Sequence, residues 1–397
     1  MIRLGLDSIG MLCDKLDNPQ SKLNFIHIAG TNGKGSVGVF IASILKTAGF
    51  RVGHFSSPAV FSREEVICIN QRPVSKKKYD EAKILIDEKC VELKEEGKSI
   101  PTEFEKETAK AFYIFQKEEC DVVVLECGMG GKTDATNIVE NTLGAVFVPI
   151  SMDHMDYLGD SLEKITRVKS GIIKSNSIVF SALQDSAVRS ILIEEAKRCG
   201  CSFIEKGAYR KLAKNSSLKG INQIDNAELA ITVVKGIFED RISDKHIING
   251  LKNAKLSGRF ERIGINPVVI IDGGHNEAAA LSLKNNIEHY YSGKKIIHIV
   301  GMLVNKDHDR YLQIMSSVDN IILTVSTTGD RGFGCEDLAR IAVEYSDNVT
   351  SVGGVEEALD LAFMLANKGD VIVVSGTFTI LADAKKWYGL RHKRRSL

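Results

Sequence analysis

The segment Gly-Thr-Asn-Gly-Lys-Gly-Ser, from Gly30 to Ser36, is the strongest chemical signal in the sequence. It lies between an apolar run at 24–30 and an amphipathic stretch at 34–48, which predict a strand followed by a helix. Glycines let a loop turn its backbone N–H groups toward a phosphate, and the helix N-terminus adds positive potential. Lys34 is long enough to reach the terminal phosphates of a nucleotide, and the Ser36 hydroxyl is a ligand for Mg²⁺.

The spacing of this loop differs from the common pattern G-x-x-x-x-G-K-[ST]. Two residues separate Gly30 from Gly33, and a glycine follows Lys34. A glycine-rich turn with a surface lysine is the alternative interpretation. Strand, loop, lysine, hydroxyl and helix all occur in the required order, which favours phosphate binding.

A second polar segment, ECGMGGKTDATN at 126–137, begins where the apolar run at 121–128 ends. Ligands of open parallel sheets bind outside the carboxyl ends of the strands. Glu126 is therefore placed to join Ser36 as a Mg²⁺ ligand, and the glycines after it permit close approach of a substrate. The alternative is an ordinary glutamate at an exposed strand end.

His154 and Lys169 are further candidates. His154 follows the apolar run at 143–151, where a metal or phosphate ligand and a hydrogen-bonded structural histidine are equally good interpretations. Lys169 lies in a predicted helix at 161–173, on one face with Ile165. Burial would lower the pKa of its amine and make it reactive, whereas a lysine that extends along the surface is the alternative.

In the second half of the chain, Asp272 ends an apolar run and opens the segment DGGHN. An aspartate there can accept hydrogen bonds from ribose hydroxyls, and Asn276 is equally well explained as a helix N-cap. The run beginning at Asn305 invites comparison with the N-K-x-D motif of GTPases. The fourth position is His308, so this interpretation is rejected.

Short β-branched runs alternate with longer amphipathic stretches along nearly the whole chain, which predicts an α/β protein with mostly parallel strands. The pattern breaks at 252–267, which is rich in Gly, Asn and charge, and we place a domain boundary there. After it, five predicted strands are each followed by a predicted helix, as in a doubly wound unit. The sequence therefore predicts two domains, at 1–257 and 262–397.

Composition excludes several classes of protein. The 397 residues include 52 Lys and Arg against 51 Asp and Glu, a net charge of +1 that argues against general nucleic-acid binding. No apolar run is long enough to span a bilayer, and the N-terminus lacks the layout of a signal peptide. The eight cysteines form no C-x-x-C pair, which argues against zinc and disulfide frameworks. We expect a cytoplasmic protein with reduced cysteines and no membrane partner.

Taken in order, these segments resemble the folylpolyglutamate synthase and dihydrofolate synthase family, a branch of the Mur ligase superfamily. The resemblance covers nearly the whole chain and rests on IHIAGTNGKGS, FEKETAKAF, ECGMGGKTDATN, DHMDYLG, KSGIIK, SGRFE, DGGHN and NKD. It implies a P-loop-type ATP-binding N-terminal domain and a smaller Rossmann-like C-terminal domain. It also implies that the γ-phosphate of ATP passes to a substrate carboxylate, and that the amine of L-glutamate then attacks the acyl phosphate. The acceptor would be dihydropteroate, folates or both.

The resemblance also implies roles for individual residues. ATP would contact Thr31, Asn32, Gly33, Lys34, Gly35, Ser36, Gln223, Arg259, Asp272 and His275. Two Mg²⁺ ions would be held by Ser36, Glu126 and His154. The catalytic residues would be Lys34, His154 and Lys169, where Lys169 aligns with a lysine that CO₂ carbamylates in this superfamily. The acceptor substrate would contact Ser57, Pro58, Lys132 and Asp134.

Four positions depart from the family pattern. They are Ala59 for a usual His, Lys132 for Arg, Asn222 for His and Asn305 for Asp. These departures leave open a Mur-superfamily amide ligase with a different carboxylate acceptor, and a non-catalytic nucleotide-binding protein is a third hypothesis. We expect a monomer whose partners are small molecules.

Overall fold

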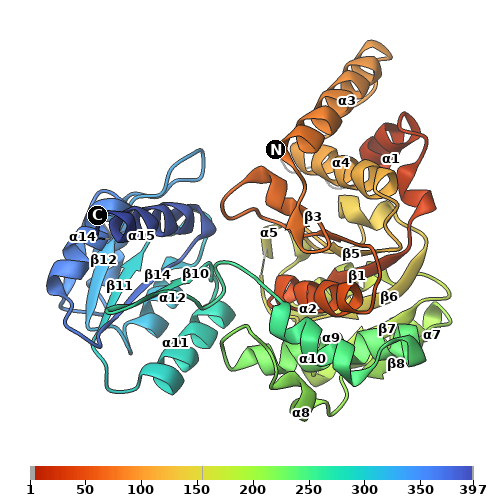
Figure 1. The fold of residues 1–397 in the computed structure, drawn as a ribbon. Helices are drawn as coiled ribbons and strands as arrows, with labels where there is room; N and C mark the ends of the chain where they lie inside the picture. The colour runs from red at the N-terminus through yellow and green to blue at the C-terminus, as the bar shows by residue number, and fades with distance from the viewer. Residues whose placement is uncertain (1–4, 154, 396–397) are drawn as a thin grey trace. The chain divides into compact units, whose positions relative to one another are not determined.

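The computed structural model describes residues 5–153 and 155–395, and the chain divides into two compact units. The first contains the residues up to 217 together with 223–255, and the second contains 218–222 together with the residues from 256 onward. This division lies beside the boundary predicted at 257, with 218–222 packed in the second unit. Each unit has its own sheet (Figure 1).

The first unit is built on an eight-stranded sheet in the order β4-β3-β2-β5-β1-β6-β7-β8. Its strands are β1 Phe25–Ala29, β2 Val52–Phe55, β3 Ile67–Ile69, β4 Arg72–Pro73, β5 Val122–Glu126, β6 Thr142–Phe147, β7 Ile178–Ser181 and β8 Ser202–Glu205. The pairs β2–β3 and β3–β4 are antiparallel, and the other described pairs of this sheet are parallel. Every residue of β1 and β5 is buried, as expected for central parallel strands covered on both faces.

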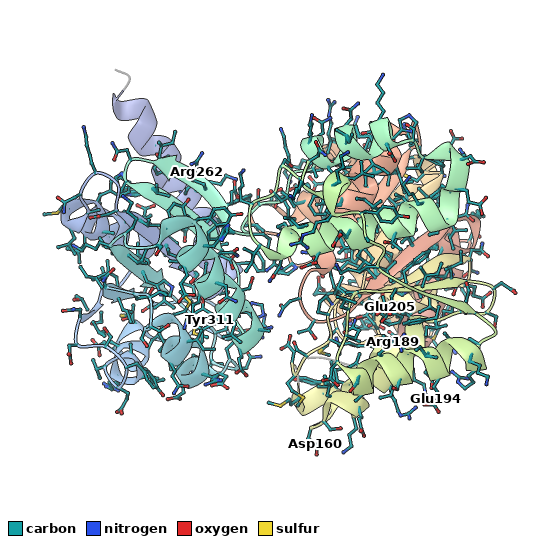
Figure 2. The ribbon with its side chains drawn as sticks, turned by 90° about the horizontal axis from the view of Figure 1, so that it is seen from below. Asp160, Arg189, Glu194, Glu205, Arg262 and Tyr311 are labelled. Atoms are coloured by element: carbon teal, nitrogen blue, oxygen red, sulfur yellow. The ribbon has the colours of Figure 1, made fainter. Side chains whose placement is uncertain are left out.

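The helices of the first unit are α1 Asp7–Asp14, α2 Lys34–Thr47, α3 Lys76–Glu95, α4 Glu103–Lys117, α5 Met155–Leu158, α6 Leu162–Lys169, α7 Ser186–Arg198, α8 Arg210–Ala213, α9 Asn222–Phe238 and α10 Asp244–Asn253. Helices α1, α3 and α4 pack together, and α10 packs on α2 (Figure 1). A capping box of Thr102 and Glu105 begins α4. Arg189 of α7 forms an ion pair with Glu205 of β8, with Nε 2.7 Å from Oε1 (Figure 2).

Helix α10 approaches α2 closely. A Cβ added to Gly250 would lie 2.5 Å from the Cα of Ile44, so only glycine permits this packing. The Ser43 hydroxyl donates a hydrogen bond to the Gly250 carbonyl at 2.6 Å. Because α2 begins inside the predicted phosphate loop, this contact fixes the helix that positions the loop.

The second unit is built on a six-stranded sheet in the order β13-β12-β11-β14-β10-β9. Its strands are β9 Glu261–Ile265, β10 Val268–Asp272, β11 Ile296–Val300, β12 Ile321–Thr324, β13 Val349–Ser351 and β14 Val371–Ser375. Its helices are α11 Glu277–Tyr291, α12 His308–Met315, α13 Cys335–Ala342, α14 Val355–Leu365 and α15 Leu381–Arg395. The β9–β10 pair is antiparallel, and the other described pairs of this sheet are parallel.

The predicted fold class is confirmed, since both units are α/β structures with mostly parallel sheets. Several elements are missing from the sequence prediction, and two of them lie in segments dense in charge. The first is α3, which begins at the lysine-rich run at 76–78. The second is β9, which lies inside the segment at 252–267. Across the described ranges, no helix is long and apolar enough to cross a membrane.

Candidate active site

The loop after β1 requires glycine at two positions. Gly30 has φ of 138°, and a Cβ on it would lie 2.7 Å from the carbonyl oxygen of Val148. Gly33 has φ of 104° and is the N-cap of α2, where a Cβ would lie 2.8 Å from Oδ1 of Asn226. Both are backbone conformations that favour glycine, so the glycine spacing noted in the sequence has a steric cause. Helix α2 then begins at Lys34, with its N-terminus at the loop.

Thr31 anchors this loop to the segment after β6. Its hydroxyl donates to the carbonyl of Ser151 and accepts from the N–H of Ser151, both at 3.0 Å. Its own N–H donates to the Pro149 carbonyl at 2.9 Å. The hydroxyl of Thr31 therefore has backbone partners already. His154, the predicted metal ligand that follows this segment, lies outside the described residues.

Two lysine amines converge on one carbonyl oxygen of the loop. Nζ of Lys34 donates to the carbonyls of Gly30 and Thr31, both at 3.2 Å. Nζ of Lys169, at the end of α6, donates to the same Gly30 carbonyl at 3.0 Å. The side chain of Lys169 is buried, as the helix pattern suggested. Both lysines are candidates from the sequence, and the fold brings their amines to one carbonyl oxygen.

The environment of Lys169 lowers the pKa of its amine from 10.5 to about 8. Burial is the main cause, and the charge of Lys34 acts in the same direction. The acidic groups of Asp153 and Asp134 oppose the shift without cancelling it. An amine with this pKa is partly neutral near physiological pH, which makes it a nucleophile for a small electrophile such as CO₂.

Glu126 is the last residue of β5 and pairs in register with Ile28 of β1, so its carboxylate lies at the edge from which the phosphate loop emerges. Glu126 and Ser36 are both buried. Among the residues that the structure describes, no cluster of three or more His, Cys, Asp or Glu side chains forms a metal site. A hydroxyl and a carboxylate nevertheless fit Mg²⁺, which typically takes one or two carboxylates and completes its shell with water and substrate phosphates.

The loop after Glu126 is organised by Asp134. Its carboxylate accepts from the N–H of Met129 at 2.7 Å, from the N–H of Thr136 at 3.0 Å and from the Thr136 hydroxyl at 2.5 Å. Burial raises the pKa of Asp134, and these hydrogen bonds oppose the shift. The side chain predicted to bind substrate therefore holds its own loop.

This loop also packs against the end of α6. A Cβ on Gly131 would lie 2.6 Å from the carbonyl oxygen of Lys169. The N–H of Lys132 donates to the Val168 carbonyl at 2.9 Å, while the Lys132 side chain is exposed. The position of the Lys169 backbone is therefore coupled to the glycine-rich loop.

A buried pair of His27 and Cys127 lies beneath this loop, and sequence reasoning missed it. Nε2 of His27 is 2.9 Å from the Thr136 hydroxyl and 3.1 Å from Sγ of Cys127. Burial lowers the pKa of His27 to about 3 and raises the pKa of Cys127. Both groups are therefore neutral, and the pair is not an activated thiolate. A histidine inside an otherwise apolar strand was the only available signal.

The remaining predicted substrate residues lie at the end of β2. The Ser57–Pro58 peptide bond is cis, and Ala59 packs against a buried apolar cluster of the first unit. Strand β2 neighbours β5, with Phe55 in register with Leu125. The Ser57–Ala59 turn and the loop after Glu126 therefore leave the same edge of the sheet.

Gln223 belongs to the first unit and is buried at the start of α9. Its Oε1 accepts from Nδ2 of Asn226 at 3.2 Å. Asn226 is the residue that faces Gly33 of the phosphate loop. The predicted nucleotide contact at Gln223 is thus linked to the loop by one side chain, which the sequence did not reveal.

In the second unit, Asp272 is the last residue of β10 and binds backbone. Its Oδ1 accepts from the N–H of Gly274 at 2.7 Å, and its Oδ2 accepts from the N–H of Phe260 at 2.8 Å. Burial raises the pKa of Asp272, and the charge of Arg259 opposes this. The aspartate predicted to contact ATP thus ties together the segments that carry Arg259 and the DGGHN turn.

Arg259 and His275 lie on those two segments. The guanidinium of Arg259 lies over the ring of Phe378, 4.6 Å from its centroid. Nδ1 of His275 is 3.0 Å from the Gly273 carbonyl. The structure therefore brings Arg259, Asp272 and His275 together at the carboxyl end of β10.

Comparison with known proteins identifies the family. Residues 28–242 match the Mur ligase middle domain, and residues 258–378 match the Mur ligase glutamate ligase domain. A dihydrofolate synthase/folylpolyglutamate synthase of Haemophilus influenzae is 30% identical over 421 residues, covering 96% of this chain and 93% of its own. The chain belongs to the dihydrofolate synthase/folylpolyglutamate synthase family of Mur ligases. As a member of that family it is an ATP-dependent ligase.

Solved structures of this ligase family agree. A folylpolyglutamate synthase of Mycobacterium tuberculosis, complexed with ADP and AMPPCP, matches with a TM-score of 0.91 and 29% identity, covering 98% of this chain and 96% of that one. A bifunctional folylpolyglutamate synthase/dihydrofolate synthase of Yersinia pestis, complexed with AMPPNP and a Mn ion, matches with a TM-score of 0.84 and 29% identity. That match covers 97% of this ligase and 93% of the Yersinia chain.

Proposed function

We propose that this ligase adds L-glutamate both to dihydropteroate and to tetrahydrofolates, through an acyl phosphate. An acceptor carboxylate oxygen attacks the γ-phosphorus of ATP, and ADP leaves. The amine of L-glutamate then attacks the acyl carbon, phosphate leaves, and the amine proton passes to solvent. Such chemistry depends on charge neutralisation and in-line positioning, which this chain's loops supply.

The observation that carries the proposal is the convergence of the Lys34 and Lys169 amines on the Gly30 carbonyl. The cationic Lys34 amine is held at the loop before any phosphate binds. Binding of ATP would exchange its two backbone carbonyl partners for phosphate oxygens, with Thr31, Asn32, Gly33, Gly35 and Ser36 shaping the loop around them. Gln223 would contact the nucleotide base and, through Asn226, hold Gly33 in place.

Ser36 and Glu126 would hold Mg²⁺, with His154 completing the proposed set. The bound ion would neutralise phosphate charge during transfer. Both side chains are buried at one edge of the sheet, which supports their selection as oxygen ligands.

Lys169 is proposed to be carbamylated. Its neutral amine would attack the carbon of CO₂ and release a proton, so that a cation becomes an anion with two acceptor oxygens. The lowered pKa supports this step, because only the neutral amine reacts. In Lys169→Ala, we expect a loss of activity that acetate or formate partly restores. A variant that kept the full rate would refute the carbamate role.

In the second unit, Arg259, Asp272 and His275 are proposed as nucleotide contacts. Ser57, Pro58 and Lys132 are proposed to contact the acceptor, with Asp134 shaping the loop that carries Lys132. The common sheet edge of the Ser57–Ala59 turn and the loop after Glu126 supports this assignment.

The deciding experiment measures glutamate-dependent ADP release with Mg²⁺, with 7,8-dihydropteroate or tetrahydrofolate as acceptor. Turnover with both acceptors is expected. Lys34→Ala should lower kcat by at least about a hundredfold, because removal of one charge-stabilising donor typically has that effect. The matched control is Lys46→Ala, which changes an exposed lysine in the last turn of the same helix and should keep the rate.

Two outcomes would contradict the proposal. Near-normal turnover by Lys34→Ala would refute the phosphate-loop assignment. A chain that binds ATP but is silent with both acceptors would instead favour a ligase with a different carboxylate acceptor. Ala59, which stands where the family resemblance places a histidine, would then be the first position to examine.

A further inference from the structure

Four polar side chains form a continuous hydrogen-bond chain inside the second unit, outside the site described above. Nδ1 of His298 in β11 is 2.6 Å from Oδ2 of Asp319, and its Nε2 is 2.6 Å from Oγ of Ser375, the last residue of β14. The hydroxyl of Tyr311 in α12 is 2.8 Å from the same Oγ (Figure 2 labels Tyr311). All four side chains are fully buried.

The order Asp319, His298, Ser375 matches that of a hydrolase triad, but the setting excludes nucleophilic catalysis. A catalytic serine must reach a substrate carbonyl. Oγ of Ser375 has no exposed surface and already contacts the His298 ring and the Tyr311 hydroxyl. Buried polar groups without access to substrate act by fixing structure, and a connected hydrogen-bond network can do so more effectively than isolated pairs.

Counting donors and acceptors assigns one direction of donation to the hydrogen-bond chain. Tyr311 donates to Ser375, Ser375 donates to Nε2 of His298, and the Nδ1–H of His298 donates to Asp319. In this order each of the two hydroxyls and the ring N–H has an acceptor among the four groups. The opposite order needs a protonated Asp319 and leaves the Tyr311 hydroxyl hydrogen without an acceptor among the four groups. The favoured direction therefore places a ring proton of His298 on Nδ1, facing Asp319.

The end of this chain at Ser375 adjoins the proposed nucleotide contacts. Ser375 pairs in register with Asp272, and its carbonyl accepts from the N–H of Gly301 at 3.2 Å. The next residue, Gly376, has φ of 104° and donates from its N–H to the Gly274 carbonyl at 3.2 Å. Gly274 is the residue whose N–H is held by Asp272.

A second connection runs through Phe378, which follows two residues after Gly376. Its ring lies beneath the Arg259 guanidinium and against Gly273, where a Cβ would have no room. Displacement of Ser375 would therefore shift Gly376 and Phe378, and with them the segments that carry Arg259, Asp272 and His275.

We propose that Asp319, His298, Ser375 and Tyr311 are positioning residues, forming a hydrogen-bond chain of fixed direction that holds the carboxyl end of β14 in place for nucleotide binding. The inference rests on the proposed function in one respect, the assignment of Arg259, Asp272 and His275 as nucleotide contacts.

Asp319→Asn tests the direction of the chain. With its N–H turned toward His298, the new amide would donate to Nδ1, and His298 would then carry its proton on Nε2 and donate to Ser375. Nitrogen-15 NMR of histidine-labelled protein reports this change, with the His298 signal assigned from His298→Gln. We expect the Nδ1–H tautomer in the wild-type protein and the Nε2–H tautomer in the variant.

The same variant tests the positioning role. We expect KM for ATP to rise about tenfold, as for the loss of one or two buried hydrogen bonds, while kcat changes less than threefold. Asp337→Asn is the matched control, because Asp337 pairs with Arg340 on the exposed face of α13 and should change neither reading. If Asp319→Asn does not fold, Ser375→Ala interrupts the chain at its centre and should raise the same KM.

Three outcomes separate the possibilities. An Nε2–H tautomer of His298 in the wild-type protein would overturn the assigned direction. A tautomer change in Asp319→Asn with an unaltered KM would overturn the positioning role. Absence of ATP binding by the wild-type protein would instead refute the proposed function. The NMR measurement would still report the direction of the hydrogen-bond chain.

Discussion

Replacement of Lys169 by methionine should stabilise the ATP-binding unit while it removes activity. The folded pKa of about 8 lies below the ordinary value of 10.5, so the buried ammonium is less stable than the same group in the unfolded chain. The lowered pKa corresponds to about 3 kcal/mol of destabilisation when the amine is protonated in both states. Methionine has a similar shape and no charge, and it forfeits one hydrogen bond worth about 1 kcal/mol.

The expected net gain at pH 7 is about 2 kcal/mol, which corresponds to a rise in Tm of about 4 to 8 °C for a unit of this size. The sign of the pH dependence follows from proton binding. Below pH 8 both states carry the proton and the full cost of Lys169 is present. Between about pH 8 and 10.5 the unfolded chain binds more protons, so wild-type stability rises with pH and the advantage of the variant shrinks.

The assay is calorimetric unfolding of both proteins in bicarbonate-free buffer at pH 7.0 and pH 9.5. The advantage of Lys169→Met should fall by about 2 kcal/mol between these two values. Lys110→Met is the matched control, because Lys110 is equally buried but forms an ion pair with Glu107 and lies over the Tyr79 ring. Its loss leaves Glu107 with the Tyr79 hydroxyl as a donor but without a cation, and should destabilise the protein by about 1 to 3 kcal/mol.

The reasoning would be refuted by a Lys169→Met variant whose Tm is unchanged or lower at pH 7. An advantage of equal size at both pH values would refute it too, because the gain would then come from packing rather than from removal of a buried charge.

Two further predictions concern the loop after Glu126. Gly131→Ala should lower the rate of glutamate-dependent ADP release at least about tenfold, because its Cβ would displace the Lys169 backbone. The control Gly10→Ala should keep the rate, because the nearest atom to its Cβ would lie 3.8 Å away. Equal rates would contradict the proposed coupling. Thr136→Val should lower the free energy of unfolding by about 2 kcal/mol in urea, because Asp134 loses a donor inside the core; wild-type stability would argue against this network.

Features determined by local sequence were the most predictable. The strand, glycine turn and helix around Lys34 follow from residue spacing within one short segment, and their bounds agree closely with the structure. Gly30 and Gly33, which the pattern singled out, each have a close steric neighbour that explains the need for glycine. Burial of Lys169 was also indicated, because the apolar positions of its helix define which face is covered.

Features that depend on the direction of a side chain were not predictable. The sequence places Asp134 in the loop after one strand and Asp272 at the end of another, where a carboxylate can equally meet a ligand or its own backbone. The structure shows that both accept backbone N–H groups. His27 and Thr136 are 109 positions apart in the sequence, and no local pattern around either residue predicts their contact. His154, outside the described residues, stays a prediction.

The elements that escaped prediction have physical reasons as well. Helix α3 carries charge around much of its surface, which obscures a narrow apolar stripe at Tyr79, Ala82, Ile86, Cys90 and Leu93. Its N-cap at Ser75 was a second local signal. Strand β9 lies within a stretch dense in glycine and charge. It becomes a strand through antiparallel pairing with β10, a tertiary interaction.

The contact between α2 and α10 has a consequence for biosynthesis. Ten residues of α2 are buried, and part of their cover comes from Gly250, which is 207 positions after its hydrogen-bond partner Ser43. At bacterial and eukaryotic translation speeds, a ribosome needs about 10 to 40 seconds to traverse that distance. Helix α2, which begins at the phosphate loop, therefore remains partly exposed until α10 leaves the exit tunnel. Nascent chains that stop short of α10 should be substrates for chaperones that bind apolar helices, and the ATP-binding unit should acquire protease resistance only when this helix has emerged.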